Sequence, residues 1–493
     1  MRTAFIPQMP LWNTPIDEIQ FDVFSRHELI PILMALQYLY TLREDVVQKV
    51  CRLIGKDLKG DRNPKRGRKG LTEWEVLVLS ACRLGCNLDY DALSDLANNH
   101  LKIRQMFGLG AMDIKRYPKS TIHDNLTRLS SETINMISNI IVGEGHTLCS
   151  NALDKVRGDS FVSQRNIHYP TDANLLLDGI RKIIEISAEL AGLHNFTRSV
   201  WRQHEYLKRK ARMCKRRIDK AQRSRAKNRE SELKAAYLCF IEHGKNMIDK
   251  SLATSHTFNQ IQNQLSFQLR ERSELLISDL QHFIAGTEII SELAWRRIVN
   301  DEKIPHDEKF FSFFEAGTEL INRGKQPFPI EFGHRVLIIQ DSAGFIIHSS
   351  VMGRGVTDEK VLTQVMKNLQ ERFNNKIKAA SFDKGFWSKI NFEELSKLID
   401  LPVLPKKGKR SAEEQQRETS PEFGEIRKWH SGVESVIHSL VAGNGMKVCR
   451  DKGSTAYARY LAMAVLGRNL QTLGTILLEK EREKQRKRLK LAA

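Results

Sequence analysis

The longest uniform stretch of the chain lies between Pro170 and Pro305, contains no proline, and limits the folds open to the sequence. Within it, from about Asn174 to Val299, the sequence reads as helix throughout, a structure that an internal proline would interrupt. The sequence just before Pro170 and the sequence after Pro305 contain β-type runs instead. We therefore predict an α/β domain that is split by a large helical insertion at 174–304.

The sequence after Pro305 alternates between strands and helices. We expect strands at 334–341, 345–351, 377–383 and 401–405, and helices at 358–373, 388–399, 429–443 and 455–480. A polar segment at 406–425 reads as a loop. Together with a first strand inside 153–170, this order predicts one mixed sheet flanked by helices.

The N-terminal region reads as a series of short helices. We expect a first helix near residues 25–56 and further helices at 72–100 and 117–142. Thr72 with Glu75 matches a capping box at the start of the second of these. A loop rich in glycine and basic residues contains four candidate DNA contacts, Lys65, Arg66, Arg68 and Lys69. Short helices joined by basic turns favour an all-helical DNA-binding region, as in a helix-turn-helix, and a plain helical bundle is the alternative.

The length of 493 residues suggests two to four domains, at roughly 150 residues per domain. We divide the chain into an N-terminal DNA-binding region (1–150), the first part of the α/β domain (151–173), the basic helical insertion (174–304), the remainder of the α/β domain (305–480) and a charged tail (481–493). Apolar residues make up 41% and charged residues 28%, which is typical of neither a disordered chain nor a membrane protein.

Nothing in the sequence indicates export or a membrane span. No run approaches the roughly 18 uninterrupted apolar residues that a span needs, and the N-terminus lacks a basic region followed by an apolar run. Seven cysteines are scattered along the chain without a paired CxxC or zinc-like spacing. We expect a reduced, cytoplasmic protein with no membrane partner.

The balance of charge points to a polyanionic partner. Lysine and arginine total 78 against 59 acids, a net charge of +19, which favours nucleic acid, with a generally basic surface as the alternative. Residues 196–230 hold 14 of these cations and only 3 acids. With so few acids to pair them, phosphate contact is favoured over a solvated, salt-bridged helix. The candidate DNA contacts are Lys208, Arg209, Lys210, Arg212, Lys215, Arg216 and Arg217.

Three acids stand where a phosphodiester-cleaving metal site would need them. Asp159 lies inside the first strand, Asp383 ends the strand at 377–383, and Glu434 borders the apolar face of the helix at 429–443. Carboxylates at strand ends commonly hold two divalent ions about 4 Å apart in such sites. Each acid alone is weak: a strand-end aspartate is usually a turn cap, and a helical glutamate is usually solvated.

Four other residues compete for functional roles. Asp172 is expected to cap the helix that begins after it, and Asp341 to cap the turn of the hairpin, although both are rival metal ligands. Trp387 and Trp429 would suit stacking on an unpaired base, but a packed core position is the more usual place for tryptophan.

Four blocks of sequence, in order, resemble bacterial insertion-sequence DDE transposases, most closely the ISNCY type. They are GDSFVSQRNIHYPTDANLLLDGIRK, EAGTELINRGKQPFPIEFGHRVLI, SFDKGFWSKINFEEL and HSGVESVIHSLVAGNGMKVCRDKGSTAYARYLAMAVLGRNL. The resemblance covers roughly residues 65–480. The acids of that family's pattern match Asp159, Asp383 and Glu434. Where some related transposases carry a Tyr, Arg and Lys around the glutamate, this chain has His430 and Val441, so that phosphate clamp is not supported.

The resemblance implies an RNase H-like catalytic domain with two Mg²⁺ ions, or Mn²⁺, held by the three acids. The implied activity is cleavage of transposon ends and joining of their 3′-hydroxyls to target DNA. The implied partners are the terminal inverted repeats, the target DNA and further copies of the chain in a homodimer or larger assembly, within the nucleoid of a bacterial cytoplasm. Further candidate DNA contacts are Arg427, Lys428, His430 and Lys447.

Three other functions remain open on the sequence. A metal-dependent nuclease on the same fold would cut nucleic acid without joining it. An inactive transposase-derived protein would bind DNA only, although all three acids are present. A structural helical scaffold would leave the basic excess and the three placed acids without a role.

Overall fold

The computed structural model describes residues 13–59, 70–110, 112–194, 200–261, 265–305, 308–315, 317–322 and 330–492, with side chains to residue 488. The chain divides into two compact units, residues 1–166 with 321–493 and residues 167–320. The second unit therefore begins a few residues before the insertion expected at 174–304 and ends after it. The expected N-terminal region and the α/β domain fall together in the first unit.

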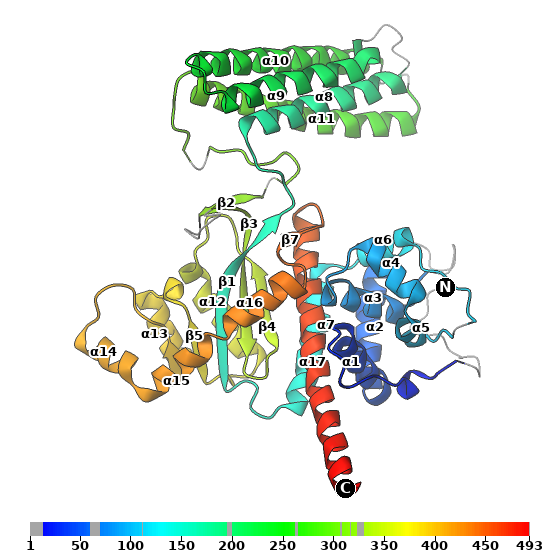
Figure 1. Ribbon diagram of the computed structural model, residues 1–493, viewed down its shortest axis with the longest axis vertical. Helices are drawn as coiled ribbons and strands as arrows, with labels where there is room; N and C mark the ends of the chain where they lie inside the picture. The colour runs from blue at the N-terminus through cyan, green and yellow to red at the C-terminus, as the bar shows by residue number, and fades with distance from the viewer. Residues whose placement is uncertain are drawn as a thin grey trace. The chain divides into compact units, whose positions relative to one another are not determined.

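The first unit begins with a series of helices (Figure 1). They are η1 (Ile16–Glu18), α1 (Leu29–Leu42), α2 (Glu44–Lys59), α3 (Glu73–Gly85), α4 (Tyr90–Asn99), α5 (Leu101–Met106), α6 (Lys119–Leu126) and α7 (Ser131–Leu148). The predicted capping box is confirmed at α3, where the Thr72 hydroxyl accepts from the Glu75 backbone N–H and the Glu75 carboxylate accepts from the Thr72 N–H.

The longest helix of the first unit, α17 (Ser454–Ala492), joins the N-terminal helices to the sheet (Figure 1). It packs on α1, α3 and α7 and also on strand β4 (Ile346–Val351). Its segment Ser454–Arg488 is long and apolar enough to cross a membrane, yet 72% of its most apolar window is buried inside the protein. The described residues thus give no clear sign of a membrane protein, because a buried core helix has the same composition.

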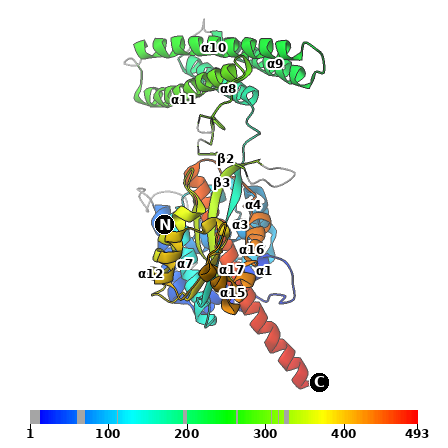
Figure 2. The same ribbon diagram turned by 90° about the vertical axis from the view of Figure 1, so that its left-hand side faces the viewer.

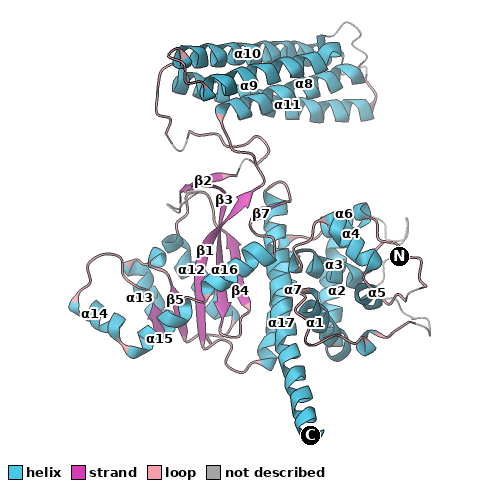
Figure 3. Ribbon diagram, in the orientation of Figure 1, coloured by secondary structure: helices cyan, strands magenta, loops and turns pink. Residues whose placement is uncertain are grey.

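The sheet of the first unit is small and mixed (Figure 3). Its strands are β1 (Lys155–Arg165), β2 (Glu319–Asn322), β3 (Ile330–Asp341), β4, β5 (Ala379–Phe382), β6 (Leu401–Val403) and β7 (Val448–Cys449). The order is β2-β3-β1-β5-β6, with β4 also paired to β3 and β7 to β1. β3 is antiparallel to β1 and β4, whereas β5 runs parallel to both β1 and β6. All four strands expected after residue 305 are present within a few residues of their expected bounds.

Helices cover both faces of this sheet. α12 (Asp358–Arg372) and α13 (Lys389–Leu398) share an apolar core with Ala380 and Phe382 of β5. α15 (Pro421–His430) packs on the neighbouring positions, Ala379 of β5 and Val403 of β6, through Phe423 and Ile426. Because successive residues of a strand point to opposite faces, α12 and α13 cover one face and α15 covers the other.

Two expectations about the segment 406–443 are wrong. The predicted loop at 406–425 contains α14 (Ala412–Thr419) and the start of α15, because Ser411 forms a capping box with Glu414 and Ser420 caps a helix that has proline at its first position. The predicted helix at 429–443 is not continuous. α15 ends at His430, and a turn separates it from α16 (Val433–His438). A short π-helical segment (Ser439–Gly443) follows α16.

The second unit is a bundle of four helices with its own core (Figures 1 and 2). They are α8 (Asp172–Leu193), α9 (His204–Arg223), α10 (Arg229–Ile261) and α11 (Phe267–Ile298). On α9 the buried residues Leu207, Ala211, Cys214, Ile218 and Ala221 form one apolar stripe at helical spacing. The helical nature expected of this proline-free stretch is confirmed.

Candidate active site

The register of two parallel strands brings Asp159 and Asp383 side by side. β1 and β5 pair in parallel, with Gly158 opposite Phe382. The next position on β1 is Asp159, and the residue that follows β5 is Asp383, which begins the 3₁₀ turn Lys384–Phe386. Neighbouring strands lie about 4.8 Å apart, so the two carboxylates project from adjacent backbones at one place in the sheet.

Both aspartates project from the face of the sheet that α15 covers. Phe382 faces the core with α12 and α13, and a Cβ on Gly158 would lie 2.5 Å from its ring, so Gly158 shares that face. Asp159 and Asp383 follow these residues and therefore point to the opposite face. This is also the face that Arg157 occupies, two residues before Asp159 on the same strand.

The electrostatics of the pair are unequal. Burial, and then the negative charge of Asp383, raise the pKa of Asp159 to about 6, although its Oδ1 accepts a hydrogen bond from the Ser160 backbone N–H at 2.7 Å. Asp383 is more exposed, with 63% of its side chain accessible. A hydrogen bond from His430, and then the charges of His430, Arg427 and Lys384, lower the pKa of Asp383. Two carboxylates with oppositely shifted pKa values, raised at Asp159 and lowered at Asp383, therefore lie next to each other on this face of the sheet.

His430 lies inside the site. Its ring Nε2 is 3.1 Å from Asp383 Oδ1, the residue is only 8% exposed, and its Nδ1 is buried with no hydrogen-bond partner in the described part of the chain. The expected DNA contact at this position is thus a buried residue that contacts Asp383. Its neighbours Arg427 and Lys428 are exposed, and Arg427 is close enough to lower the pKa of Asp383.

Arg157 fastens the end of α15 to the sheet. Its guanidinium donates to the Trp429 carbonyl at 2.5 Å and to Gln340 Oε1 at 2.9 and 2.7 Å, and it lies 4.4 Å from the centroid of the Trp429 ring. A Cβ at Gly432 would lie 2.2 Å from its Nη1, so the chain can turn from α15 into α16 here because residue 432 has no side chain. This close approach lies at the interruption of the predicted helix at 429–443.

Glu434 follows that turn in the first turn of α16, a helix that packs against β1 (Figure 1). Its side chain is exposed. Among the residues that the structure describes, no three His, Cys, Asp or Glu side chains are grouped closely enough to hold a metal ion. The structure therefore brings together two of the three expected acids and places Glu434 on the adjoining helix without bringing it into contact with them.

The chemistry of the two aspartates suits a hard divalent cation. Both offer carboxylate oxygens, which are the preferred ligands of Mg²⁺ and Mn²⁺. The pKa of Asp159 is raised by burial and then by the negative charge of Asp383, and a cation would offset the second of these. Asp159 and Asp383 are the pair that could hold such an ion, whereas Glu434 is not grouped with them in the described part of the chain.

The two rival acids are engaged elsewhere. Asp172 belongs to the second unit, where it pairs with Arg297, and the cap of α8 is Thr171 rather than Asp172 as expected. Asp341 is buried at the end of β3, opposite Val156. It accepts from the Phe345 backbone N–H across the hairpin turn, as predicted for a turn cap, and also contacts His146 Nε2 at 2.7 Å.

The two tryptophans are packed. Trp429 is half-buried with Arg157 and Lys155 over its ring, at 4.4 and 5.2 Å from the centroid. Trp387 is half-buried against the main core, with Lys406 Nζ 5.4 Å from its ring centroid. Both rings thus already have partners within the protein, as the packing alternative expects.

The expected basic surface of the second unit lies on α9. Five of the seven candidates are exposed, and no ion pair joins them to an acid in the described part of the chain: Arg209, Lys210, Arg212, Arg216 and Arg217. Of these, Arg209, Arg212 and Arg216 lie opposite the apolar stripe. The other two are partly engaged, because Lys208 pairs with Glu205 and Lys215 with Asp219. Lys447 of the first unit is exposed, and Lys65, Arg66, Arg68 and Lys69 lie outside the described residues.

Arg157 is the site residue that the sequence interpretation missed. An arginine inside the expected strand, two positions before an acid, was the available signal, since residues two apart share a face. Its partners Gln340 and Trp429 are distant in sequence, so their identity could not be read from the pattern.

Comparisons of the chain with protein-family models, with curated proteins and with solved structures find no match.

Proposed function

We propose that the protein is a DNA transposase that cleaves the ends of an insertion sequence and joins their 3′-hydroxyls to target DNA. The observation that carries the proposal is the pairing of Asp159 with Asp383 on adjacent parallel strands, next to a helix that bears Glu434. The sequence resemblance supplies the same three residues. Their order along the sheet supports a metal-dependent site for phosphoryl transfer.

The sheet supports the RNase H-like part of the proposal. An RNase H-like domain would have three antiparallel strands followed on one side by two strands parallel to the first, with the acids on the first strand and at the end of its parallel neighbour. β4, β3 and β1, then β5 and β6, have this order and these directions. The helical bundle of 167–320 is then inserted between the first and second strands of that domain.

The proposed reaction is two in-line phosphoryl transfers. Water attacks the phosphorus at the transposon end, the P–O3′ bond breaks, and a 3′-hydroxyl is released. That 3′-hydroxyl then attacks a target phosphorus, so a new P–O3′ bond forms while the target's own 3′-oxygen leaves. Mg²⁺ ions held by the proposed acids would supply charge neutralisation and an activated oxygen nucleophile.

The chain's own residues prepare this site. Asp159 and Asp383 concentrate negative charge where cations must bind, and His430 fixes the orientation of the Asp383 carboxylate through its hydrogen bond. Arg157 holds the end of α15 and hence the start of α16, the helix that carries Glu434. The cations Arg427 and Lys384 beside Asp383 would attract the DNA backbone to the same face.

The direct test is Mg²⁺-dependent cleavage and joining on DNA that carries the element's own ends. We expect the wild-type protein to cut and join, and Asp159→Asn, Asp383→Asn and Glu434→Gln each to lose activity by at least a hundredfold while still binding DNA. Asp400→Asn is the matched control, because Asp400 is an exposed carboxylate outside the site, at the start of β6.

Each other outcome selects an alternative. Cleavage without joined products would identify a metal-dependent nuclease instead. DNA binding without cleavage by the wild-type protein would identify an inactive, transposase-derived DNA-binding protein, a reading that the exposed position of Glu434 favours. Full activity in Glu434→Gln alone would remove that residue from the metal site.

A further inference from the structure

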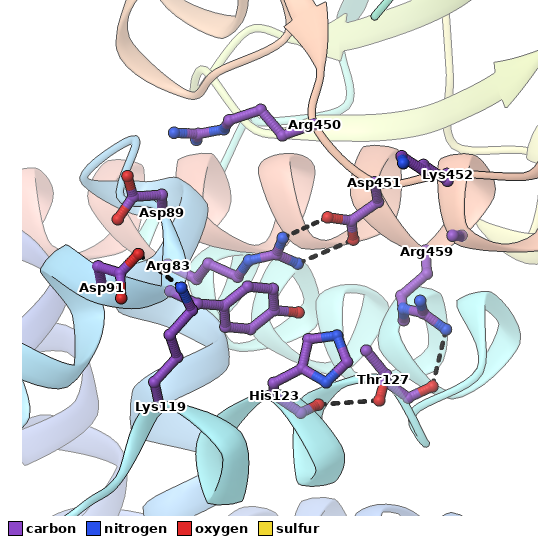
Figure 4. Close-up of a pocket in the computed structure, with 12 residues that line it drawn as sticks. Arg83, Asp89, Asp91, Lys119, His123, Thr127, Arg450, Asp451, Lys452 and Arg459 are labelled. Atoms are coloured by element: carbon purple, nitrogen blue, oxygen red, sulfur yellow. Dashed lines mark hydrogen bonds and ion pairs between the residues drawn. The ribbon is translucent and has the colours of Figure 1, made fainter. Parts of the chain in front are cut away.

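The first unit contains a second site of interest, a cavity of about 480 Å³ whose lining includes none of the three acids. One wall comes from the N-terminal helices, through residues of α3, α4 and α6, and the other from the loop after β7 and the start of α17 (Figure 4). These walls contain parts of two sequence blocks covered by the resemblance, LDYDALSDLANNH and CRDKGSTAYARY. The first has no role in the proposed catalytic site, and the second lies after Glu434 in the same block of the resemblance.

A buried ion pair fixes the two walls to each other. Arg83 of α3 donates to both carboxylate oxygens of Asp451, at 3.1 and 2.5 Å, and only 2% of its side chain is exposed. Its guanidinium also lies 4.0 Å from the centroid of the Tyr90 ring, in the cavity wall. Such a bidentate pair, already formed in the protein, holds the cavity open in one shape.

The acids of the cavity are already engaged. Asp451 pairs with Arg83, Asp91 pairs with Lys119 at 2.6 Å, and Asp89 caps α4 by accepting from the Ala92 backbone N–H. The lining contains five lysines and arginines against these three acids, so it carries a positive excess.

Two of the cations have donors to spare. Lys452 is exposed and makes no hydrogen bond or ion pair in the described part of the chain. Arg459 donates from Nη1 to the Thr127 carbonyl at 2.7 Å, while its Nε is buried with no partner (Figure 4). A third cation, Arg450, is already held by Asn87 and the Tyr460 hydroxyl.

We propose that this cavity binds a phosphate group of the DNA backbone through Lys452 and Arg459. Arginine presents several donors in a planar fork that matches phosphate oxygens, and lysine adds a mobile point charge. The cavity volume falls within the range of about 300–1,000 Å³ that ligand sites occupy, which is ample for one nucleotide unit. The choice of DNA over a free phosphate rests on the proposed function.

The test measures how DNA binding by the full-length protein depends on salt. The affinity for a labelled duplex is measured over a series of KCl concentrations for wild type, Lys452→Gln and Arg459→Gln. Loss of one phosphate contact should lower the slope of log K against log [KCl] by about one, whatever the DNA sequence. Lys376→Gln is the matched control, since Lys376 is exposed in the same unit and outside the cavity, and its slope should equal that of wild type.

Unchanged slopes in both cavity variants would overturn the proposal. Lys452→Gln guards against a folding defect, because Lys452 makes no contact whose loss would unfold the protein. A second arm compares the melting temperatures of wild type and Arg459→Gln in inorganic phosphate and in chloride at equal ionic strength. If phosphate stabilises only wild type while the DNA slopes stay equal, the ligand is a free phosphate and the DNA assignment is wrong.

The result is separable from the catalytic proposal. Asp159→Asn should bind DNA with the wild-type slope, because that residue does not line the cavity. Loss of cleavage with intact slopes would therefore count against the transposase activity alone, and altered slopes with normal cleavage chemistry would concern the cavity alone.

Discussion

Asp159 carries an unfavourable charge that the fold imposes on it. Burial and the neighbouring Asp383 raise its pKa to about 6, well above the roughly 3.9 of a free aspartate. Between about pH 4 and pH 6 the folded protein therefore binds more protons than the unfolded chain, and its stability falls as the pH rises through this range.

We predict that Asp159→Asn stabilises the metal-free protein at pH 8. The asparagine removes the buried charge, so the free energy of unfolding should rise by about 1–3 kcal/mol at pH 8 and hardly change at pH 4. Thermal unfolding in EDTA at both pH values measures the effect. Asp400→Asn serves as the control and should leave the melting temperature unchanged at both. Equal stability of wild type and Asp159→Asn at pH 8 would contradict a raised pKa at this residue.

At the scale of elements, glycines set how closely the core helices approach. A Cβ on Gly467 of α17 would lie 2.6 Å from the Gly85 backbone nitrogen of α3, so the two helices cross with their backbones in contact. On α7, by contrast, a Cβ on Gly143 would meet nothing within 4 Å. The same residue type thus has a packing role in one helix and none in the other.

This contrast gives a pair of predictions with opposite signs. Gly467→Ala should destabilise the protein by about 1–3 kcal/mol, because the added methyl must push apart two backbones in the core. Gly143→Ala should be neutral or stabilising by up to about 1 kcal/mol, because alanine favours helix and the space is open. The melting temperatures of the two variants test both predictions. If Gly143→Ala lowers the melting temperature as much as Gly467→Ala does, the crossing of α3 and α17 is not specifically tight.

The element scale also shows where sequence patterns are sufficient. The strands around 334–351 and the capping box at Thr72 are determined by local alternation and local hydrogen bonds, and both were predicted. The signal for α14 was present as a Ser411–Glu414 capping box but was outweighed by the polar composition of the segment. The break before α16 was not predicted; in the folded chain it lies where Arg157 of β1 approaches Gly432.

At the scale of the whole molecule, the charge excess is concentrated on particular surfaces. Arg209, Arg212 and Arg216 lie on one face of α9, exposed and without ion pairs in the described part of the chain. Elsewhere in the same unit, cations such as Arg270 and Arg272 are exposed but paired with glutamates. Placement, and not only the net charge of +19, should therefore decide DNA affinity.

We predict that replacing Arg209, Arg212 and Arg216 together by glutamine weakens DNA binding and lowers its salt slope by about two to three. The matched control replaces Lys245, Arg270 and Arg272 by glutamine, which removes the same net charge from other surfaces of the unit, and should change the slope by less than one. The affinities of wild type and of the two triple variants for a labelled duplex are measured over a series of KCl concentrations, and their slopes are compared. Equal losses in both triple variants would show that only the total charge matters.

The sequence by itself determined the helical insertion, the strands that flank it, the basic face of α9 and the three acids proposed as the site. These features depend on local spacing, on the absence of proline and on residue type, all of which the chain carries without folding. Only the tertiary structure decided that Asp159 and Asp383 lie side by side, that His430 and Arg157 belong to their surroundings, and that the N-terminal helices share a core with the sheet through α17. Those relations join residues far apart in sequence, and strand register and helix packing, which no local pattern specifies, bring them together.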